Sequence, residues 1–405
     1  MTTHARDAAT GGAINLSFLV LARVCTSAVF MTYPACLNAL LSEWQMTATN
    51  AGIVQGVFTA AFALSLLIAS YLCDRIGAKR VFNAATMLSA VAAILFAFFA
   101  RSFETAVVFV SLVGLFQGGT YTPAIMLVSA NTPQDRKASA VGWVLAGMSA
   151  GYVISIFLST SLLALYGYKA AFLATALITV LGWGFGYLAV CRARDQIHDE
   201  GPAQGAVFDK AMKRRSKLLT LGYIGHSWEL LEAWAWVPAF LTAAILPRGT
   251  MSPIELGLWI ALVLHLSGFC SSFLSGYAAD RFGARSVLIA FALLGALCSA
   301  SIGWLTDVSV PLLLIVAAIY GFATIGDSSV LSSAMTDAVP AQYLGRALGL
   351  RSVLGIGAGA ASPAIFGLTL DLAPGAYAWG FAFGTLAVGG ALAILCAVLL
   401  PRRNA

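Results

Sequence analysis

The segment 222–240, which reads GYIGHSWELLEAWAWVPAF, places His226, Glu229 and Glu232 inside an apolar run long enough to cross a bilayer. At about 100° per residue, these three side chains fall within one third of the helix circumference. A carboxylate in hydrocarbon costs roughly 2.5–3.5 kcal/mol at mid-depth. The spacing therefore predicts a wet strip that binds a proton or a substrate. The alternative, that the acids only pair with basic residues to hold the helices together, stays open.

Arg23 lies inside the first apolar run. Because an arginine keeps its proton, it must meet a carboxylate, a carbonyl or a bound anion there. In one interpretation, its guanidinium holds a substrate carboxylate through two parallel hydrogen bonds. In the other, it is locked to Glu229, Glu232 or Asp327, or it extends its charged end to the cytoplasmic surface.

Asp327 is the acid of the tenth run, where it is predicted either to carry a coupling proton or to brace Arg351 or Arg346. Uncharged polar, aromatic and histidine side chains in other runs add donors and flat surfaces. The candidates for substrate contact among them are Tyr33, Gln55, Gln117, Tyr121, Trp228, Trp236 and His265. For each, packing or hydrogen bonding to a neighbouring helix is the competing interpretation.

Composition indicates a membrane protein. Of 405 residues, 60% are apolar and 10% are charged, which no soluble domain of this length needs. The net charge of +6 is spread through short loops, so it does not indicate nucleic-acid binding. The seven cysteines show no metal-ligand spacing. With no nucleophile–base pattern or phosphate loop, neither an enzyme nor a cofactor is expected.

Helices must position these side chains. Twelve apolar runs are long enough to cross a bilayer: 14–40, 48–72, 81–100, 105–130, 138–165, 169–191, 218–246, 253–278, 286–305, 309–332, 347–370 and 376–400. The one long polar connection, 192–217, separates six runs from six. The sequence thus predicts an all-α membrane protein with six-helix bundles at 1–191 and 218–405, joined by a linker.

The two halves repeat each other. Four landmarks recur at separations of 204 to 207 positions: Pro34 with Pro238, Asp74 with Asp280, Pro133 with Pro340, and Gly142 with Gly349. A nearly constant offset predicts two similar bundles related by a pseudo-two-fold axis along the membrane normal, as in parallel-repeat transporters.

Basic residues predict the orientation. Nineteen of the 23 Lys and Arg residues, Arg351 among them, fall in one set of loops and ends, and three fall in the other set. The positive-inside rule then places both termini and the linker in the cytoplasm. We expect a bacterial inner membrane, and one chain suffices for a complete path.

Two segments resemble the cytoplasmic loop signature of the major facilitator superfamily, SYLCDRIGAKR at 70–80 and GYAADRFGAR at 276–285. In that pattern a Gly precedes Asp-Arg by four residues, and a Gly and basic residues follow. The second copy is complete, whereas Ser70 replaces the leading Gly of the first. The resemblance implies two rocking bundles with a conformational switch at Asp74, Arg75, Gly77, Arg80, Asp280, Arg281, Gly283 and Arg285. There, Asp74 and Arg75 are expected to cap a neighbouring helix end and to exchange ion pairs.

Drug/proton antiporters of the same superfamily carry Gly-x-x-x-Gly-Pro in the fifth helix. Gly147 and Gly151 keep the glycine spacing, which permits close helix approach, but Tyr152 replaces the proline. The departure argues against drug export.

These observations predict a secondary active transporter that moves a small, monocarboxylate-like organic anion with protons by alternating access. Arg23 is the expected anion partner, and Glu229 or Glu232, with His226, is the expected proton site. Three alternatives stay open. The acids bind a cation for proton-driven efflux of lipophilic or cationic compounds; His226, Glu229 and His265 bind a transition metal for transport; or the protein binds a ligand as a sensor and moves nothing.

Overall fold

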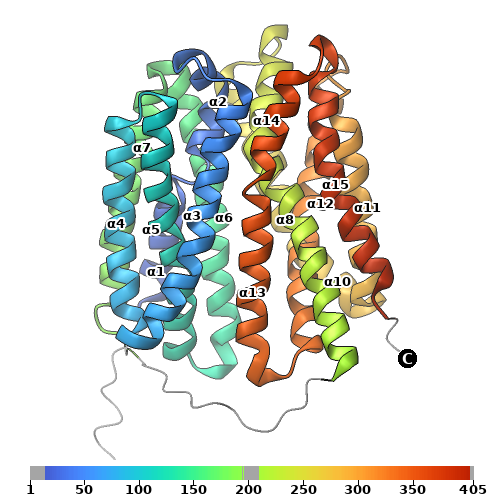
Figure 1. The fold of residues 1–405 in the computed structure, drawn as a ribbon. Helices are drawn as coiled ribbons and strands as arrows, with labels where there is room; N and C mark the ends of the chain where they lie inside the picture. Colours follow the sequence, from blue (N-terminus) through green and yellow to red (C-terminus); the bar gives the residue numbers. More distant parts are fainter. Residues whose placement is uncertain (1–13, 194, 196–208, 402–405) are drawn as a thin grey trace, which may run out of the picture.

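The computed structural model describes residues 14–193, 195 and 209–401. In this part of the chain the regular secondary structure is helical, without strands, and twelve spans are long and apolar enough to cross a membrane. Each of the twelve predicted runs overlaps one of these spans, so the predicted all-α membrane fold is confirmed. The first six spans form one bundle and the last six form a second (Figure 1). Most of the predicted linker, residues 194 and 196–208, lies outside the described residues, as do both chain ends.

The helices follow the apolar runs. The N-terminal bundle contains α1 (Leu16–Ser27), α2 (Thr32–Glu43), α3 (Ala48–Ile76), α4 (Ala78–Phe99), α5 (Phe103–Asn131), α6 (Gln134–Tyr166) and α7 (Tyr168–Val190). The C-terminal bundle contains α8 (Lys210–Ile245), η2 (Leu246–Arg248), α9 (Pro253–Ala261), η3 (Leu262–Leu266), α10 (Ser267–Phe282), α11 (Ala284–Ile302), α12 (Val310–Ala338), α13 (Ala341–Gly359), α14 (Ser362–Leu372), η4 (Gly375–Tyr377) and α15 (Ala378–Leu399).

Two spans predicted as continuous helices are interrupted. The first divides into α1 and α2, and Pro34 lies in the first turn of α2, where its missing N–H is not needed. The amide of Met31, at the break, donates to Oγ of Ser155 on α6 at 3.1 Å. The eleventh span divides into α13 and α14 just before Pro363. Interrupted helices free backbone groups at mid-membrane, where protein neighbours must satisfy them.

α8 begins earlier than predicted. Its first residue, Lys210, lies inside the segment 192–217 that was assigned to the linker. Asp209 caps this helix, with its carboxylate accepting from the amide of Met212 at 2.7 Å. The basic residues that follow form exposed helical turns before the apolar run begins at residue 218, where charged side chains can stay in water.

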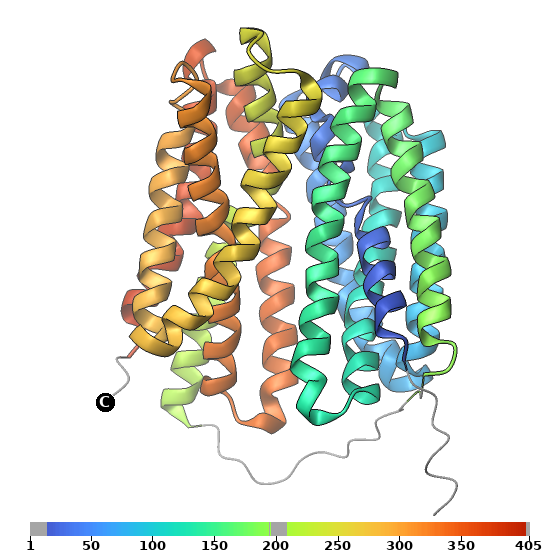
Figure 2. The same ribbon diagram turned by 180° about the vertical axis from the view of Figure 1, so that it is seen from behind.

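The starts of α1 and α8 and the end of α15 lie at one face of the molecule, here termed the linker face (Figure 1). The bundles meet toward the opposite face, where α3 packs on α14, α2 on α8, and α6 on α9 (Figures 1 and 2). Asn38 Nδ2 donates to the carbonyl of Ala239 at 2.8 Å across this junction. The carboxylate of Asp371 on α14 accepts from the amides of Ala48 and Thr49 at 2.9 and 2.8 Å. These contacts close the opposite face.

Both copies of the loop signature form tight turns. Gly77 joins α3 to α4 with φ of +92°, and Gly283 joins α10 to α11 with φ of +82°, a region that favours glycine. The helix-end contacts there differ from the expectation. Asp195, rather than Asp74, accepts from the amide of Lys79 at 3.0 Å, and Arg285 donates to the carbonyl of Val398 at 2.8 Å.

The other signature side chains lie outward. Asp74, Arg80 and Asp280 are exposed, Arg75 lies 4.4 Å from the ring of Tyr71, and Arg281 lies 5.4 Å from the ring of Phe282. Their part in conformational switching stays a prediction.

Candidate functional site

A cavity of about 300 Å³ lies between the two bundles. The N-terminal bundle lines it from α3, α5 and α6, and from Phe30 at the α1–α2 break. The C-terminal bundle lines it from α8, α12 and α13. The lining residues are Phe30, Phe58, Thr59, Phe62, Leu66, Tyr121, Met148, Tyr152, Tyr223, Ser227, Leu230, Leu231, Trp234, Ser328, Ser332, Arg351, Ser352 and Ile356. Because both bundles contribute, any movement of one against the other reshapes this space.

Arg351 is the cation among the lining residues. Its guanidinium lies 4.2 Å from the ring of Tyr223 and donates to Oγ of Ser332 at 3.1 Å. Although Arg351 is only 5% exposed, its Nε and Nη1 have no hydrogen-bond partner within the described chain. Arg351 was predicted to lie with the cytoplasmic loops, which was wrong, because it is a buried residue inside α13. Its place inside the apolar run 347–370 was the signal that this prediction overlooked.

Arg23 lies behind the cavity wall. It is 3% exposed, donates to Oγ1 of Thr120 at 2.6 Å, and lies 6.0 Å from the ring of Tyr121. Tyr121 lines the cavity, so its ring stands between Arg23 and that space. Among the described residues, no ion pair joins Arg23 to Glu229, Glu232 or Asp327. The predicted internal pair is therefore absent in this conformation.

Three other predicted contacts of the N-terminal bundle lie away from the cavity. Gln117 donates to the carbonyl of Thr26 and so ties α5 to α1. Tyr33 donates to the carbonyl of Ala51 at 3.1 Å. Tyr33 and Gln55 line a separate small pocket inside the bundle. Gln117 and Tyr33 thus join backbone segments in this conformation, and the substrate contacts predicted for all three residues stay predictions.

The tryptophans separate into two groups. Trp234 lines the cavity. Trp228 donates to the carbonyl of Thr385 at 3.1 Å, and the fully buried Trp236 donates to that of Pro363 at 3.0 Å. Trp236 also stacks on Phe366, with ring centroids 4.9 Å apart. Trp228 and Trp236, predicted as substrate contacts, thus bond and pack within the C-terminal bundle in this conformation, and Trp234 is the tryptophan among the residues that line the cavity.

His265 lies in η3, a π-helical turn of the eighth span. Its ring lies 5.4 Å from Tyr152 and 5.8 Å from Trp234, both of which line the cavity. The histidine itself lines a lateral, almost wholly apolar groove of about 470 Å³ between α6 and α10. It does not line the cavity itself, and its substrate contact stays a prediction.

Glu229 and Glu232 are buried in the interior of the C-terminal bundle, outside the cavity lining. Ser299 on α11 donates to Oε1 of Glu229 and contacts the hydroxyl of Tyr320 at 3.1 Å. Thr385 on α15 donates to Oε1 of Glu232 at 2.7 Å. The partners of both acids are hydroxyls, so neither acid forms a salt bridge within the described part of the chain.

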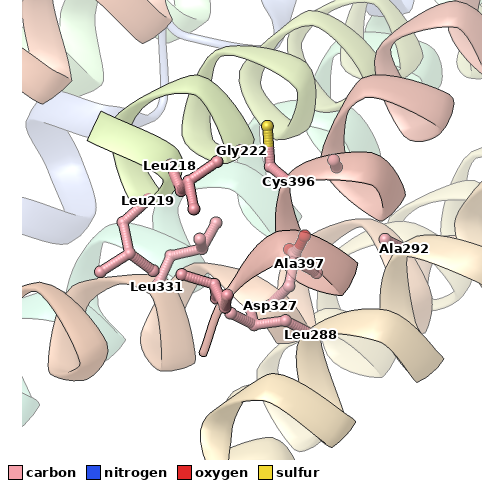
Figure 3. A pocket seen from close by; sticks show the side chains of 11 residues that line it. Leu218, Leu219, Gly222, Leu288, Ala292, Asp327, Leu331, Cys396 and Ala397 are labelled. Carbon is pink, nitrogen blue, oxygen red and sulfur yellow. The ribbon is translucent and has the colours of Figure 1, made fainter. Parts of the chain in front are cut away.

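His226 pairs with Asp327. Its Nδ1 lies 2.7 Å from Oδ1 of Asp327, and its Nε2 lies 3.0 Å from Oγ of Ser328, which lines the cavity. Spacing along the sequence had placed His226 with Glu229 and Glu232, because a partner on another helix cannot be seen from that spacing. Asp327 also borders a narrow crevice inside the C-terminal bundle (Figure 3). It does not brace Arg351, since Arg351 has no acidic partner among the described residues.

A transition-metal site needs several ligands at one point. The described residues hold no group of three or more His, Cys, Asp and Glu side chains that could bind a metal ion. His226, Glu229 and His265 each have different neighbours, so in this conformation they do not form the joint site that the metal-transport alternative expected.

Comparisons with known proteins agree with this fold. The family model for the Major Facilitator Superfamily matches residues 19–269 and 248–405. A probable 4-methylmuconolactone transporter of Cupriavidus pinatubonensis is 22% identical over 79% of this chain and 77% of its own length. The gentisate transporter of Corynebacterium glutamicum is 23% identical over 90% of this chain and 82% of its own.

Among solved structures, a bacterial homolog to the human lysosomal transporter Spinster, in an inward-facing and unoccupied conformation, matches with a TM-score of 0.71. It is 14% identical, and the match covers 95% of each chain. The relatives and the fold are those of transporters rather than enzymes. With the family match over nearly its whole length, twelve membrane spans and two six-helix bundles, this chain belongs to the major facilitator superfamily of transporters.

Proposed function

We propose that this protein transports a small organic carboxylate, with a planar or cyclic body, through the cavity between its bundles. The observation that carries the proposal is Arg351. A buried guanidinium with two donor nitrogens unpartnered in the described chain is a preformed partner for a carboxylate. Ser332 and Tyr223 hold the guanidinium in place, which lowers the entropic cost of binding.

The distribution of charge supports an anion. Arg351 faces the cavity and Arg23 stands behind Tyr121, whereas Glu229 and Glu232 lie in the interior of one bundle. Two cations near a low-dielectric space, with the acids set apart from it, favour negative charge in that space. The same arrangement disfavours the efflux of cationic compounds, which needed the acids to face the cavity.

The walls support a flat, apolar body. Phe30, Phe58, Phe62, Tyr152 and Trp234 line the cavity. Their rings suit edge-to-face or stacked contact with a ring or a conjugated chain. A volume of about 300 Å³ is at the lower end for ligand pockets, which fits a small molecule. The named substrate of one relative, gentisate, is an aromatic carboxylate of this kind.

We further propose transport by alternating access, with protons as the coupling ion and one chain as the working unit. The bundles are closed at the opposite face in this conformation, as the Asp371 and Asn38 contacts describe. If the basic linker face is cytoplasmic, as the positive-inside rule expects, this conformation is the inward-facing one in a bacterial inner membrane.

Exchange of labelled gentisate in proteoliposomes tests the proposal. The wild type is expected to exchange external for internal gentisate, with competition by other small carboxylates and none by amines. Arg351→Gln should abolish exchange, and Arg351→Lys should retain part of it, since a point charge replaces the fork. Arg101→Gln, an exposed arginine, is the matched control. Inhibition by amines but not carboxylates, or full exchange by Arg351→Gln, would contradict the proposal.

A further inference from the structure

The His226–Asp327 pair connects two separate spaces. Through Ser328 it reaches the wall of the substrate cavity, because Nε2 of His226 lies 3.0 Å from Oγ of that serine. Through the Asp327 side chain it reaches the crevice inside the C-terminal bundle (Figure 3). No other acid of the described chain lines either space, so this pair is placed to hold a charge that both can sense.

The crevice leads from Asp327 toward the linker face. Residues of α8, α11, α12 and α15 line it, among them Gly222, Leu331 and Cys396. Its lining extends to Leu218, in the third turn of α8, and to Leu400, directly after the end of α15. Its volume of about 10 Å³ is close to what one water molecule needs. The walls are otherwise apolar apart from the Cys396 thiol, so Asp327 is the group that would draw a water into this space.

We propose that the His226–Asp327 pair is the proton-binding site of the transporter, and that protons exchange with the linker face through this crevice rather than through the substrate cavity. The proposal rests on the proposed function, because it assigns the site of its coupling ion. Loading one proton onto the Asp327 carboxyl changes the pair from one negative charge to zero. The neutral pair no longer repels a carboxylate at Arg351.

The surroundings of the pair leave this charge change uncompensated. On α8, the ring of Tyr223 lies 5.5 Å from that of His226, and Glu229 follows His226 by one turn toward the opposite face. On α13, the guanidinium of Arg351 lies 4.2 Å from the ring of Tyr223 and donates to Oγ of Ser332 at 3.1 Å. On α12 itself the next ionisable group toward the opposite face is Tyr320, the partner of Ser299.

The remaining neighbours are weakly polar. α15 contributes the thiol of Cys396 and α11 contributes Leu288 and Ala292 to the crevice. α10 packs on α12 through Ser275, whose hydroxyl lies 3.0 Å from that of Ser329. Within the described chain, then, His226 is the one basic side chain in ion-pair contact with Asp327.

Two substitutions distinguish the residue that binds the proton from the crevice through which the proton would pass. Asp327→Asn keeps the size of the side chain but cannot take up the proton. Gly222→Val narrows the crevice: a Cβ at Gly222 would lie 3.5 Å from Cβ of Cys396 and 3.8 Å from Cδ2 of Leu331, which are ordinary contacts. The valine methyl groups then occupy the remaining space. Gly384→Val on α15 is the control, since a Cβ there meets nothing within 4 Å.

The variants are compared in proteoliposomes by two assays with labelled gentisate. Exchange at equal pH requires substrate binding and alternation between the two faces but no net proton movement. Accumulation in a pH gradient requires these two steps and net proton movement as well. Asp327→Asn is expected to keep exchange and to lose accumulation. Gly222→Val should keep exchange with slowed accumulation, and Gly384→Val should match the wild type. If Asp327→Asn does not fold, His226→Gln breaks the same pair and carries the same expectation.

Infrared spectroscopy of the purified protein tests the site without any substrate. We expect a protonated-carboxyl band that Asp327→Asn removes and whose hydrogen–deuterium exchange Gly222→Val slows. Failure of the wild type to exchange any carboxylate would sink the proposed function and leave the infrared result to decide the proton site. The proton route would be overturned if Asp327→Asn accumulated substrate at the wild-type rate. It would also be overturned if the hydrogen–deuterium exchange of the band were not slowed in Gly222→Val, or if the band were lost only in Glu229→Gln.

Discussion

The carboxylate of Asp371 caps the helix that begins beside Thr49. Asp371 belongs to α14 of the C-terminal bundle, and its Oδ2 accepts from both the amide and the hydroxyl of Thr49 on α3, at 2.8 and 2.6 Å. A negative charge at a helix N-terminus meets unpaired N–H groups and the positive end of the helix dipole. The contact joins the two bundles at the face opposite the linker, and under the proposed alternating access it would be present only while that face is closed.

Asp371→Asn is expected to weaken this closed state and to raise the population that is open at the opposite face, because the charge-assisted hydrogen bonds are lost. The distance between spin labels at K169C and D307C, exposed positions of the two bundles near that face, is expected to gain a longer component. Glu104→Gln, an exposed acid in the first turn of α5 within one bundle, serves as the control. An unchanged distance distribution in Asp371→Asn would show that this contact does not hold the face closed.

Trp234 and Trp236 are expected to respond oppositely to alanine substitution. Trp236 is fully buried and packs on Phe366, so Trp236→Ala should cost about 3–5 kcal/mol of unfolding free energy. Trp234 lines the cavity, so Trp234→Ala should raise the KM for substrate with a smaller effect on stability. Thermal unfolding in detergent and uptake kinetics check the two effects. Equal KM changes in both variants would argue against a cavity role for Trp234.

Tyr121 and Tyr33 form a second contrast. Tyr121→Phe removes the hydroxyl from the ring between Arg23 and the cavity, and we expect weaker substrate binding. Tyr33→Phe removes a hydrogen bond to the carbonyl of Ala51, worth about 1 kcal/mol, and should leave substrate binding unchanged. Binding of labelled substrate to purified protein measures both. If Tyr33→Phe is the variant with the weaker binding, the ligand lies in the small pocket inside the N-terminal bundle that Tyr33 and Gln55 line.

Ser299→Ala tests how the buried Glu229 is held. The serine hydroxyl is the donor to Oε1 of this acid, and its removal leaves a buried polar atom unpaired, at a cost of about 1–3 kcal/mol. Ser301→Ala on the same helix removes only an exposed hydroxyl that bonds to the carbonyl of Leu297, so its stability should change little. Thermal unfolding compares the two. Equal stability of both variants would mean that another group, such as water, takes over the serine's hydrogen bond.

The twelve spans and the division into two bundles could be predicted from hydropathy and the internal repeat, and the resemblance at 70–80 and 276–285 located the loops that contain Gly77 and Gly283. Hydropathy over about 20 residues is a local property, since each span must bury its own backbone in lipid. A repeat offset is likewise visible without coordinates. Helix continuity could not be predicted in the same way. At the break before Thr32, the freed amide of Met31 is satisfied by Ser155, a residue far along the chain.

Which polar residues are neighbours, or line the same cavity, could be seen only in the folded structure. His226 was grouped with Glu229 by its position on α8, yet its partner Asp327 lies on α12, about a hundred positions away. Arg23 and Arg351 are both buried arginines, but rotation and packing of their helices put one behind a tyrosine and the other at the cavity. Periodicity predicts which residues lie on one helical face. It does not tell which neighbouring helix, lipid or cavity that face meets, because that follows from contacts between segments distant in sequence.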